Sequence, residues 1–256
     1  MTIRVGQIRG VPRKGDLEAN HALLMRLLSG VAAERLDAVV TPECFLDGYV
    51  VTEESVSAAD LRQHAVDPET SGQVLEAAAW ARDSGTWLIL GCTRLVPGGV
   101  RNSALVIDRS GRLAGVYDKT HCQTHDRKFE PGNALPVFPS DFGPFGVVIC
   151  ADRRWPETIR SLALRGARIV FNPTYGMHDE LNLCLMRTRA FESELYVAFT
   201  HPEQSLVTGP RGEVILDERG TAPALAVTEV NLTVVDSVRT GPSAHLRDRR
   251  PELYGL

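Results

Sequence analysis

The chain has 256 residues, of which 43% are hydrophobic and 23% are charged, a composition typical of a folded globular protein. Its formal net charge of -4 gives no support for binding to nucleic acids or to anionic membranes. No apolar run approaches the ~20 residues that cross a membrane, and we expect residues 1–10 to form a strand rather than a signal peptide. The five scattered cysteines favour the reducing cytoplasm over a disulfide-bonded secreted protein.

Strand and helix patterns alternate along the chain. In the first half they predict strands over 3–9, 37–43 and 86–95, helices over 16–35 and 73–83, and a hairpin over 101–119. In the second half they predict strands over 143–150, 167–174, 195–201 and 224–230, helices over 157–165 and 179–194, and a hairpin that turns at 210–212.

No linker or charge block divides this alternation, so we expect a single domain over residues 1–256. Hairpins mixed with strand-helix-strand units predict an α/β fold, with a mixed sheet or with two sheets packed face to face and helices outside. The polar tail over residues 245–256 is expected to pack on the surface or on a partner.

Cys150 ends an apolar run and lies shortly before a helix start marked by Pro156. In open α/β sheets, ligands bind at the carboxyl ends of strands, so a thiol there is a candidate nucleophile. Taken alone, however, a cysteine after an apolar strand is more often an inert core residue. The same reasoning predicts small buried side chains for Cys44, Cys92 and Cys184.

Two further reactive side chains also lie at predicted strand ends. Glu43 and Lys119 would each be ordinary solvated charges in isolation. Together with Cys150 they form a mechanism, because Glu43 can accept the thiol proton and Lys119 can stabilise both the thiolate and a developing oxyanion. The backbone amide of Ala151 is a candidate second oxyanion donor. The predicted chemistry is acyl transfer through a thioester, followed by hydrolysis by a water that Glu43 activates.

These three segments resemble the nitrilase (carbon-nitrogen hydrolase) superfamily. The resemblance is carried by PECFLDGY, YDKTH and CADRRWPE, in this order, and it extends to FEPGN, FNPT and RRPELY. It implies a four-layer αββα sandwich of two mixed sheets with outer helices. It also implies a catalytic triad of Glu43, Lys119 and Cys150, no metal, no cofactor, and homodimers or larger homo-oligomers built on a paired α-layer.

The loop after Lys119 departs from the family pattern. Members of the family often carry a second glutamate there, a few residues before F-x-P-G, whereas this chain offers His125 and Asp126. Either the shorter Asp126 substitutes for the glutamate, or His125 brings different hydrogen bonding and titration near neutral pH. His121 and Cys122 complete a possible metal cluster, but the paired spacing of zinc ligands is missing, so we expect a lid loop with His121 bonded to backbone.

Two adjacent arginines, Arg153 and Arg154, follow the cysteine. One of them can pair with Asp152 or Glu157 near the helix start, which would be a structural role. Alternatively, one can clamp a substrate carboxylate, as the resemblance of D-R-R-W-P-E to N-carbamoyl-D-amino-acid amidohydrolases implies. Aromatic and imidazole side chains that can line a pocket, or simply pack, are Trp155, Tyr175 and His178.

The sequence therefore predicts a hydrolase of a non-peptide carbon-nitrogen bond in a small molecule, either an amide or an N-carbamoyl compound. Three alternatives remain open: a nitrilase, an acyltransferase that passes the acyl group to an amine, and a catalytically idle binding module with the same fold. The intact set of Glu43, Lys119 and Cys150 argues against the idle module.

Overall fold

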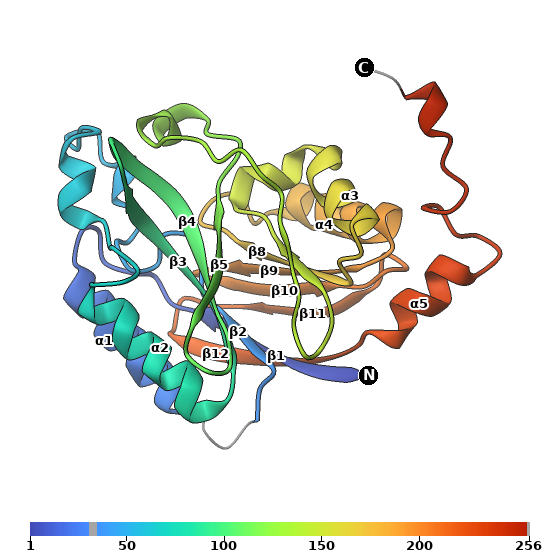
Figure 1. The fold of residues 1–256 in the computed structure, drawn as a ribbon, viewed down its shortest axis with the longest axis horizontal. Helices are drawn as coiled ribbons and strands as arrows, with labels where there is room; N and C mark the ends of the chain where they lie inside the picture. Colours follow the sequence, from blue (N-terminus) through green and yellow to red (C-terminus); the bar gives the residue numbers. More distant parts are fainter. Residues whose placement is uncertain (31–34, 255–256) are drawn as a thin grey trace.

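Two six-stranded mixed sheets form the centre of the molecule (Figure 1). The computed structural model describes residues 1–30 and 35–254. The first sheet, in the order β12-β1-β2-β3-β4-β5, contains β1 (Thr2–Arg9), β2 (Ala38–Val40), β3 (Trp87–Val96), β4 (Gly99–Ile107), β5 (Leu113–Asp118) and β12 (Ala224–Asn231). The second, in the order β11-β10-β9-β8-β7-β6, contains β6 (Val137–Phe138), β7 (Phe145–Val147), β8 (Ile169–Pro173), β9 (Tyr196–His201), β10 (Gln204–Thr208) and β11 (Val214–Arg219).

Four of the described helices cover the outer faces of these sheets: α1 (Leu17–Ser29), α2 (Gly72–Ser84), α3 (Pro156–Leu164) and α4 (Glu180–Ser193). A further helix, α5 (Thr233–Thr240), follows β12 and packs Val235 into the apolar cluster between the sheets. Helices α1 and α2 lie on the first sheet and share an apolar cluster with it, while α3 and α4 do the same on the second (Figure 1). This arrangement confirms the predicted αββα sandwich of two mixed sheets.

Alternation along the strands explains these layers. In β3, Ile89 packs between the two sheets, whereas Leu88 and Leu90 pack against the helices. In the second sheet, Phe171 likewise faces the first sheet, and its neighbour Val170 faces α3 and α4. Because both faces of these strands are buried, their sequences are continuous apolar runs rather than alternating ones.

Most predicted elements are present, with small differences at their ends. The side chain of Asp16 accepts a hydrogen bond from the amide of Ala19 and starts α1, as the sequence predicted. The helix ends at Ser29 rather than continuing to residue 35, and residues 31–34 lie outside the described part of the chain. Pro156 occupies the first turn of α3, and Asp179 caps α4.

Two features of the fold differ from the prediction. Cys44 and Cys92 are buried as expected, but Cys184 is exposed on α4, so the prediction for that cysteine was wrong. Helix α5 had not been predicted at all. The tail after α5 packs on the surface, where the backbone amide of His245 donates to Glu194 and Leu246 packs against the apolar cluster of α3 and α4. No helix within residues 1–30 and 35–254 is long and apolar enough to span a membrane.

Candidate active site

The structure brings Glu43 and Lys119 into direct contact. Glu43 lies in the loop that follows β2, and Lys119 is the residue directly after β5. The Oε1 atom of Glu43 lies 2.7 Å from the Nζ atom of Lys119, and both side chains are almost completely buried. Cys150 begins a short 3₁₀ turn (Cys150–Arg154) beyond the end of β7 in the second sheet. The three predicted residues therefore follow the carboxyl ends of strands in both sheets, β2 and β5 in the first and β7 in the second.

Glu43 is held by three donors, two of which sequence reasoning missed. Besides Lys119, the Nδ2 atom of Asn102 donates to Oε1 at 2.8 Å, and the amide of Tyr175 donates to Oε2 at 3.0 Å. Burial raises the pKa of Glu43, although the neighbouring Lys119 acts in the opposite direction. A carboxylate that is fixed in position and has a raised pKa is suited to accept a proton near neutral pH.

The close approach of two segments at Glu43 requires a glycine. A Cβ atom on Gly91 of β3 would lie 2.2 Å from the carbonyl oxygen of Pro42 and 3.2 Å from the Cα atom of Glu43. Any larger residue at position 91 would therefore displace the backbone that carries the carboxylate.

Lys119 lies between two carboxylates. Its Nζ atom also donates to the Oδ2 atom of Asp126 at 2.5 Å. Burial alone would lower the pKa of Lys119, but the carboxylates of Glu43 and Asp126, together with the thiolate form of Cys150, outweigh this effect and raise its pKa well above the usual value. The ammonium group is therefore charged at all physiological pH values, as an oxyanion donor must be.

Asp126, rather than His125, contacts the lysine. The other carboxylate oxygen of Asp126 accepts a hydrogen bond from the hydroxyl of Tyr49 at 2.8 Å. His125 lies one step further out, with its Nε2 atom 2.9 Å from the same hydroxyl, and its side chain is 39% exposed. Of the two residues that the sequence offered in place of a second glutamate, Asp126 thus has the geometry to position Lys119.

The backbone of Cys150 is strained, with a φ angle of +45° that non-glycine residues rarely adopt. Its Sγ atom lies 3.6 Å from the Nη1 atom of Arg153 and accepts a hydrogen bond from the amide of Gly176. Burial and the charge of Glu43 raise the pKa of Cys150, while Lys119, Arg153 and the Gly176 amide act against this increase. Because the pKa is raised, the resting thiol keeps its proton, so a nearby base must remove it.

Asp152 connects the two segments that carry the lysine and the cysteine. Its buried carboxylate accepts hydrogen bonds from the hydroxyls of Tyr117 (2.7 Å) and Thr120 (2.9 Å) and from the amides of His121 (2.9 Å) and Ile149 (3.0 Å). The Nδ1 atom of His121 also lies 2.9 Å from it. The expectation that His121 bonds to backbone was therefore wrong, because the Asp152 carboxylate takes that place.

The two arginines occupy different environments. Arg153 is fully buried, and it donates from Nε to Asn182 and from Nη2 to the carbonyl oxygen of Met177, each at 2.8 Å. Arg154 is exposed and donates to the side chain of Gln123 at 3.1 Å. Arg153 is thus the arginine beside the thiol, and its partners are neither of the carboxylates considered from the sequence.

The three residues that were expected to line a pocket, Trp155, Tyr175 and His178, each contact another aromatic or imidazole ring. The ring of Trp155 stacks on His121 with centroids 4.0 Å apart. The ring centroid of Tyr175 lies 5.1 Å from that of Tyr49, next to the amide contact with the carboxylate described above. His178 lies further out and stacks on His201 with centroids 4.1 Å apart.

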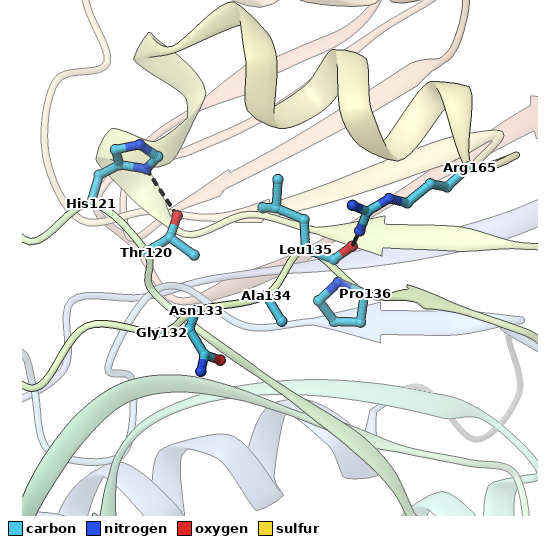
Figure 2. A pocket seen from close by; sticks show the side chains of 8 residues that line it. All are labelled: Thr120, His121, Gly132, Asn133, Ala134, Leu135, Pro136 and Arg165. Carbon is cyan, nitrogen blue, oxygen red and sulfur yellow. Dashed lines mark hydrogen bonds between the residues drawn. The ribbon is translucent and has the colours of Figure 1, made fainter.

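A cavity of about 540 Å³ opens beside this site (Figure 2). Figure 2 shows Thr120 and His121 at one end, and Arg165 bonded to the carbonyl oxygen of Leu135 at the other. The residues that line the cavity are Thr120, His121, Gly132, Asn133, Ala134, Leu135, Pro136 and Arg165. The cavity thus adjoins the lysine-bearing segment, while the thiol lies outside its lining.

Among the described residues, His178, His201 and Glu203 place ligand-type atoms within 4.8 Å of one another. However, both ring nitrogens of His201 are occupied, because Nδ1 accepts from the amide of Glu203 at 3.0 Å and Nε2 donates to the carbonyl oxygen of Tyr175 at 2.7 Å. Burial lowers the pKa of His201 to about 4, so the ring is neutral. The group is therefore a hydrogen-bonded wall with no free imidazole lone pair on His201 for a metal.

Comparisons with known proteins agree with this geometry. The family model described as carbon-nitrogen hydrolase matches residues 2–240. A hydrolase encoded in the pqqF 5' region of Pseudomonas protegens is 34% identical over 99% of this chain and 91% of its own length. Nit3 of Saccharomyces cerevisiae, a member of branch 10 of the nitrilase superfamily, has a similar fold, with a TM-score of 0.83, 22% identity and 97% of each chain covered. An amidase from Nesterenkonia sp. has a TM-score of 0.79 and 25% identity, over 98% of this chain and 95% of its own.

Proposed function

The chain belongs to the carbon-nitrogen hydrolase family, and on that premise we propose that it hydrolyses a small amide or N-carbamoyl compound through a cysteine thioester. Cys150 is the nucleophile, Glu43 the general base and Lys119 the oxyanion donor. The observation that carries the proposal is the buried 2.7 Å contact between Glu43 and Lys119, next to a cysteine in a strained turn. The similarity to an amidase of known structure supports amides as the substrate class.

In the first half of the reaction, Glu43 takes the proton from Sγ of Cys150 as the sulfur attacks the substrate carbonyl carbon. A carbon-sulfur bond forms, and the carbonyl electron pair moves onto oxygen, where Lys119 and the amide of Ala151 receive it. The oxyanion then collapses and the carbon-nitrogen bond breaks. Glu43 returns its proton to the departing nitrogen, which leaves as ammonia or an amine, and the acyl group stays on sulfur as a thioester.

In the second half, Glu43 removes a proton from a water molecule that attacks the thioester carbon. The carbon-sulfur bond breaks, the proton returns to sulfur, and a carboxylic acid leaves. An N-carbamoyl substrate would leave as a carbamic acid, which loses carbon dioxide to give the free amine. Glu43 thus acts twice as base and twice as acid, which requires that one carboxyl group hold a proton transiently in a buried site.

The charges around Lys119 support this use of Glu43. One ammonium group lies between two carboxylates, so its charge can neutralise only one of them. The repulsion between the two carboxylates makes it easier for one of them to hold a proton than it would be for an isolated carboxylate. The hydrogen bond from the Tyr49 hydroxyl holds Asp126 in contact with Lys119. Glu43 is then the carboxylate that exchanges protons with the substrate.

Ammonia release from a panel of compounds tests the proposal. The panel contains aliphatic amides, N-carbamoyl amines, N-carbamoyl amino acids and nitriles, and each is compared between the wild type and Cys150→Ser. We expect turnover of at least one amide or N-carbamoyl compound, and loss of nearly all of it in the variant, because an alcohol is a much poorer nucleophile at neutral pH. Turnover of nitriles alone would favour a nitrilase. Turnover that survives in Cys150→Ser would contradict the proposal.

We also propose that the protein forms homodimers or larger homo-oligomers through its α3/α4 layer. Three large apolar side chains are exposed on these helices, Leu164 at 48%, Leu181 at 67% and Phe191 at 45%. Exposed apolar side chains on an outer helical layer can be buried when two copies of the layer pair. Light scattering should give at least twice the monomer mass, and Leu181→Glu should reduce it. A monomeric wild type would contradict this proposal.

A further inference from the structure

Arg153 is a charged side chain with an unusual position. It is the largest fully buried side chain in the described residues, with 0% exposure, and its guanidinium lies 3.6 Å from the thiol sulfur through Nη1. A buried charge is unfavourable unless it is paired or bound by polar groups. The side chain must therefore be fixed by its surroundings, and its charge must serve the site that it faces.

The surroundings of Arg153 fix it in one orientation. The Nε atom is committed to the side chain of Asn182, and Nη2 to the carbonyl oxygen of Met177. The guanidinium carbon also lies 5.2 Å from the ring centroid of Phe199, a cation-π geometry. All three of these partners are neutral, so the positive charge is not cancelled by a carboxylate among them. What remains for Nη1 is the sulfur of Cys150.

The same arrangement argues against a bidentate carboxylate clamp formed by Nε and Nη2. A clamp needs two parallel N–H groups on one edge of the guanidinium that are free for the ligand. In Arg153, Nε and Nη2 are already occupied by protein acceptors. A substrate carboxylate on the Nε–Nη2 edge would have to replace both of these buried hydrogen bonds.

We propose that Arg153 is a second catalytic cation, which stabilises the thiolate of Cys150 while the substrate is attacked. This inference rests on the proposed function, in which Cys150 is the nucleophile. It assigns to Arg153 a contact with the reacting atom, in place of the contact with a substrate carboxylate that the sequence suggested.

The charges around the sulfur explain why a second cation is needed. Glu43, Lys119 and Asp126 together carry one more negative charge than positive, and Tyr49 is a neutral phenol beside them. When the thiol proton moves to Glu43, the negative charge moves to sulfur while Asp126 still shares Lys119. The guanidinium then balances the thiolate, because it stays protonated at any physiological pH.

Besides Arg153 and the exposed Arg154, the same turn carries the charged group of Asp152. Its carboxylate is directed at Tyr117, Thr120 and His121, away from the sulfur contact, and a change at Arg153 leaves those partners in place. Substitution of Arg153 therefore tests the guanidinium charge against an otherwise constant set of groups.

The experiment measures alkylation of Cys150 by iodoacetamide between pH 6 and 10, with peptide mapping to identify the modified cysteine. Arg153→Met removes the charge and keeps much of the volume, and Arg153→Lys keeps a charge. We expect alkylation of Cys150 at pH 7 to be at least about tenfold slower in Arg153→Met, because less thiolate is present. Arg153→Lys should recover part of that loss, which a purely structural role would not require.

Substrate kinetics separate this role from a clamp. We expect Arg153→Met to lower kcat for neutral and for carboxylate-bearing substrates by a similar factor, about 100-fold. A rise in KM confined to carboxylate-bearing substrates would establish the clamp and overturn the inference. The matched control for the alkylation profile is Arg154→Met, which removes an exposed charge from the same turn and should leave that profile unchanged.

Circular dichroism identifies variants that fold. If Arg153→Met does not fold, Arg153→Gln makes the same test, since its amide can still donate a hydrogen bond while lacking the charge. An alkylation profile equal to the wild type in a folded, uncharged variant would overturn the inference. Because alkylation needs no substrate, this result is independent of the ammonia-release panel, which tests the proposed function itself.

Discussion

Replacement of Asp126 by asparagine gives a quantitative test of the proposed base. Asp126 and Glu43 bind the same Nζ atom of Lys119 at 2.5 and 2.7 Å, so these two carboxylate oxygens are at most about 5 Å apart. At that separation, and with an effective dielectric constant of about 20, their repulsion is about 3 kcal/mol. This repulsion is one cause of the raised pKa of Glu43, in addition to its burial.

Asp126→Asn removes the repulsion and leaves Lys119 to Glu43 alone. The pKa of Glu43 should therefore fall, and Glu43 should become a weaker base. In a profile of kcat/KM against pH, the acidic limb reports the loss of activity as the base becomes protonated. We expect this limb to move to lower pH in Asp126→Asn, and kcat on the plateau to fall by about 10- to 100-fold.

Two control variants separate the charge of Asp126 from its neighbours. Tyr49→Phe removes the other hydrogen bond on Asp126 but keeps its charge, and His125→Ala removes the exposed imidazole beside it. Both should leave the acidic limb close to its wild-type position. The reasoning would be refuted by a limb that stays in place in Asp126→Asn and moves in His125→Ala, because His125 would then control the base.

Three further predictions concern residues that support the site. Gly91→Ala should lower the free energy of unfolding by about 1–3 kcal/mol and reduce kcat, because its Cβ would clash with the carbonyl oxygen of Pro42; a variant with wild-type melting and activity would contradict the close approach. Burial raises the pKa of Asp47 to about 7, above its unfolded value, so its contribution to stability is fully present below about pH 4 and is lost as pH rises toward 7. Asp47→Asn should remove that pH dependence, which is a change of up to about 4 kcal/mol in the free energy of unfolding between pH 4 and pH 8. The same change in both proteins would argue against this role of Asp47. Asp152→Asn removes one hydrogen-bond acceptor, such as that for the Ile149 amide. The variant should melt at a lower temperature, and its Cys150 should be alkylated more slowly. Normal alkylation in a destabilised variant would limit Asp152 to a role in stability.

The sequence predicted the three candidate catalytic segments because each carries a local signal. One apolar run ends at Cys150, and another ends a few residues before Glu43. A predicted hairpin ends at Lys119. Strand ends in an α/β fold meet at common edges, so reactive residues at such ends are expected to converge. The layer order could also be predicted, since strands that are buried on both faces have continuous apolar sequences.

The polar residues that hold the three candidate catalytic residues gave no local signal. Asn102 lies within an ordinary strand, and its bond to Glu43 joins residues 59 positions apart. Asp152 lay inside a recognised motif, but its hydrogen bonds to Tyr117 and Thr120 span 35 and 32 positions. The first contact depends on how the strands of one sheet are aligned, and the others depend on how the two sheets face each other. A window of sequence contains neither.

The sequence also could not predict which side chains of a short helical turn are buried and which are exposed. Successive residues of a 3₁₀ turn point about 120° apart, so Arg153 is buried while Arg154 is exposed. The sequence contains nothing local that distinguishes these neighbours. Helix α4 shows the same limitation, because Leu181 and Cys184 are apolar residues on its exposed face.

The most direct test of the central claim is the mass of the acyl-enzyme. The wild-type protein is mixed with a turned-over amide, quenched in acid within the first turnover, and analysed by mass spectrometry of the intact chain and of its peptides. The proposed mechanism predicts an added mass equal to the acyl group, located on Cys150 and absent from Cys150→Ser. Turnover with the acyl group on another residue, or with undiminished activity in Cys150→Ser, would contradict it.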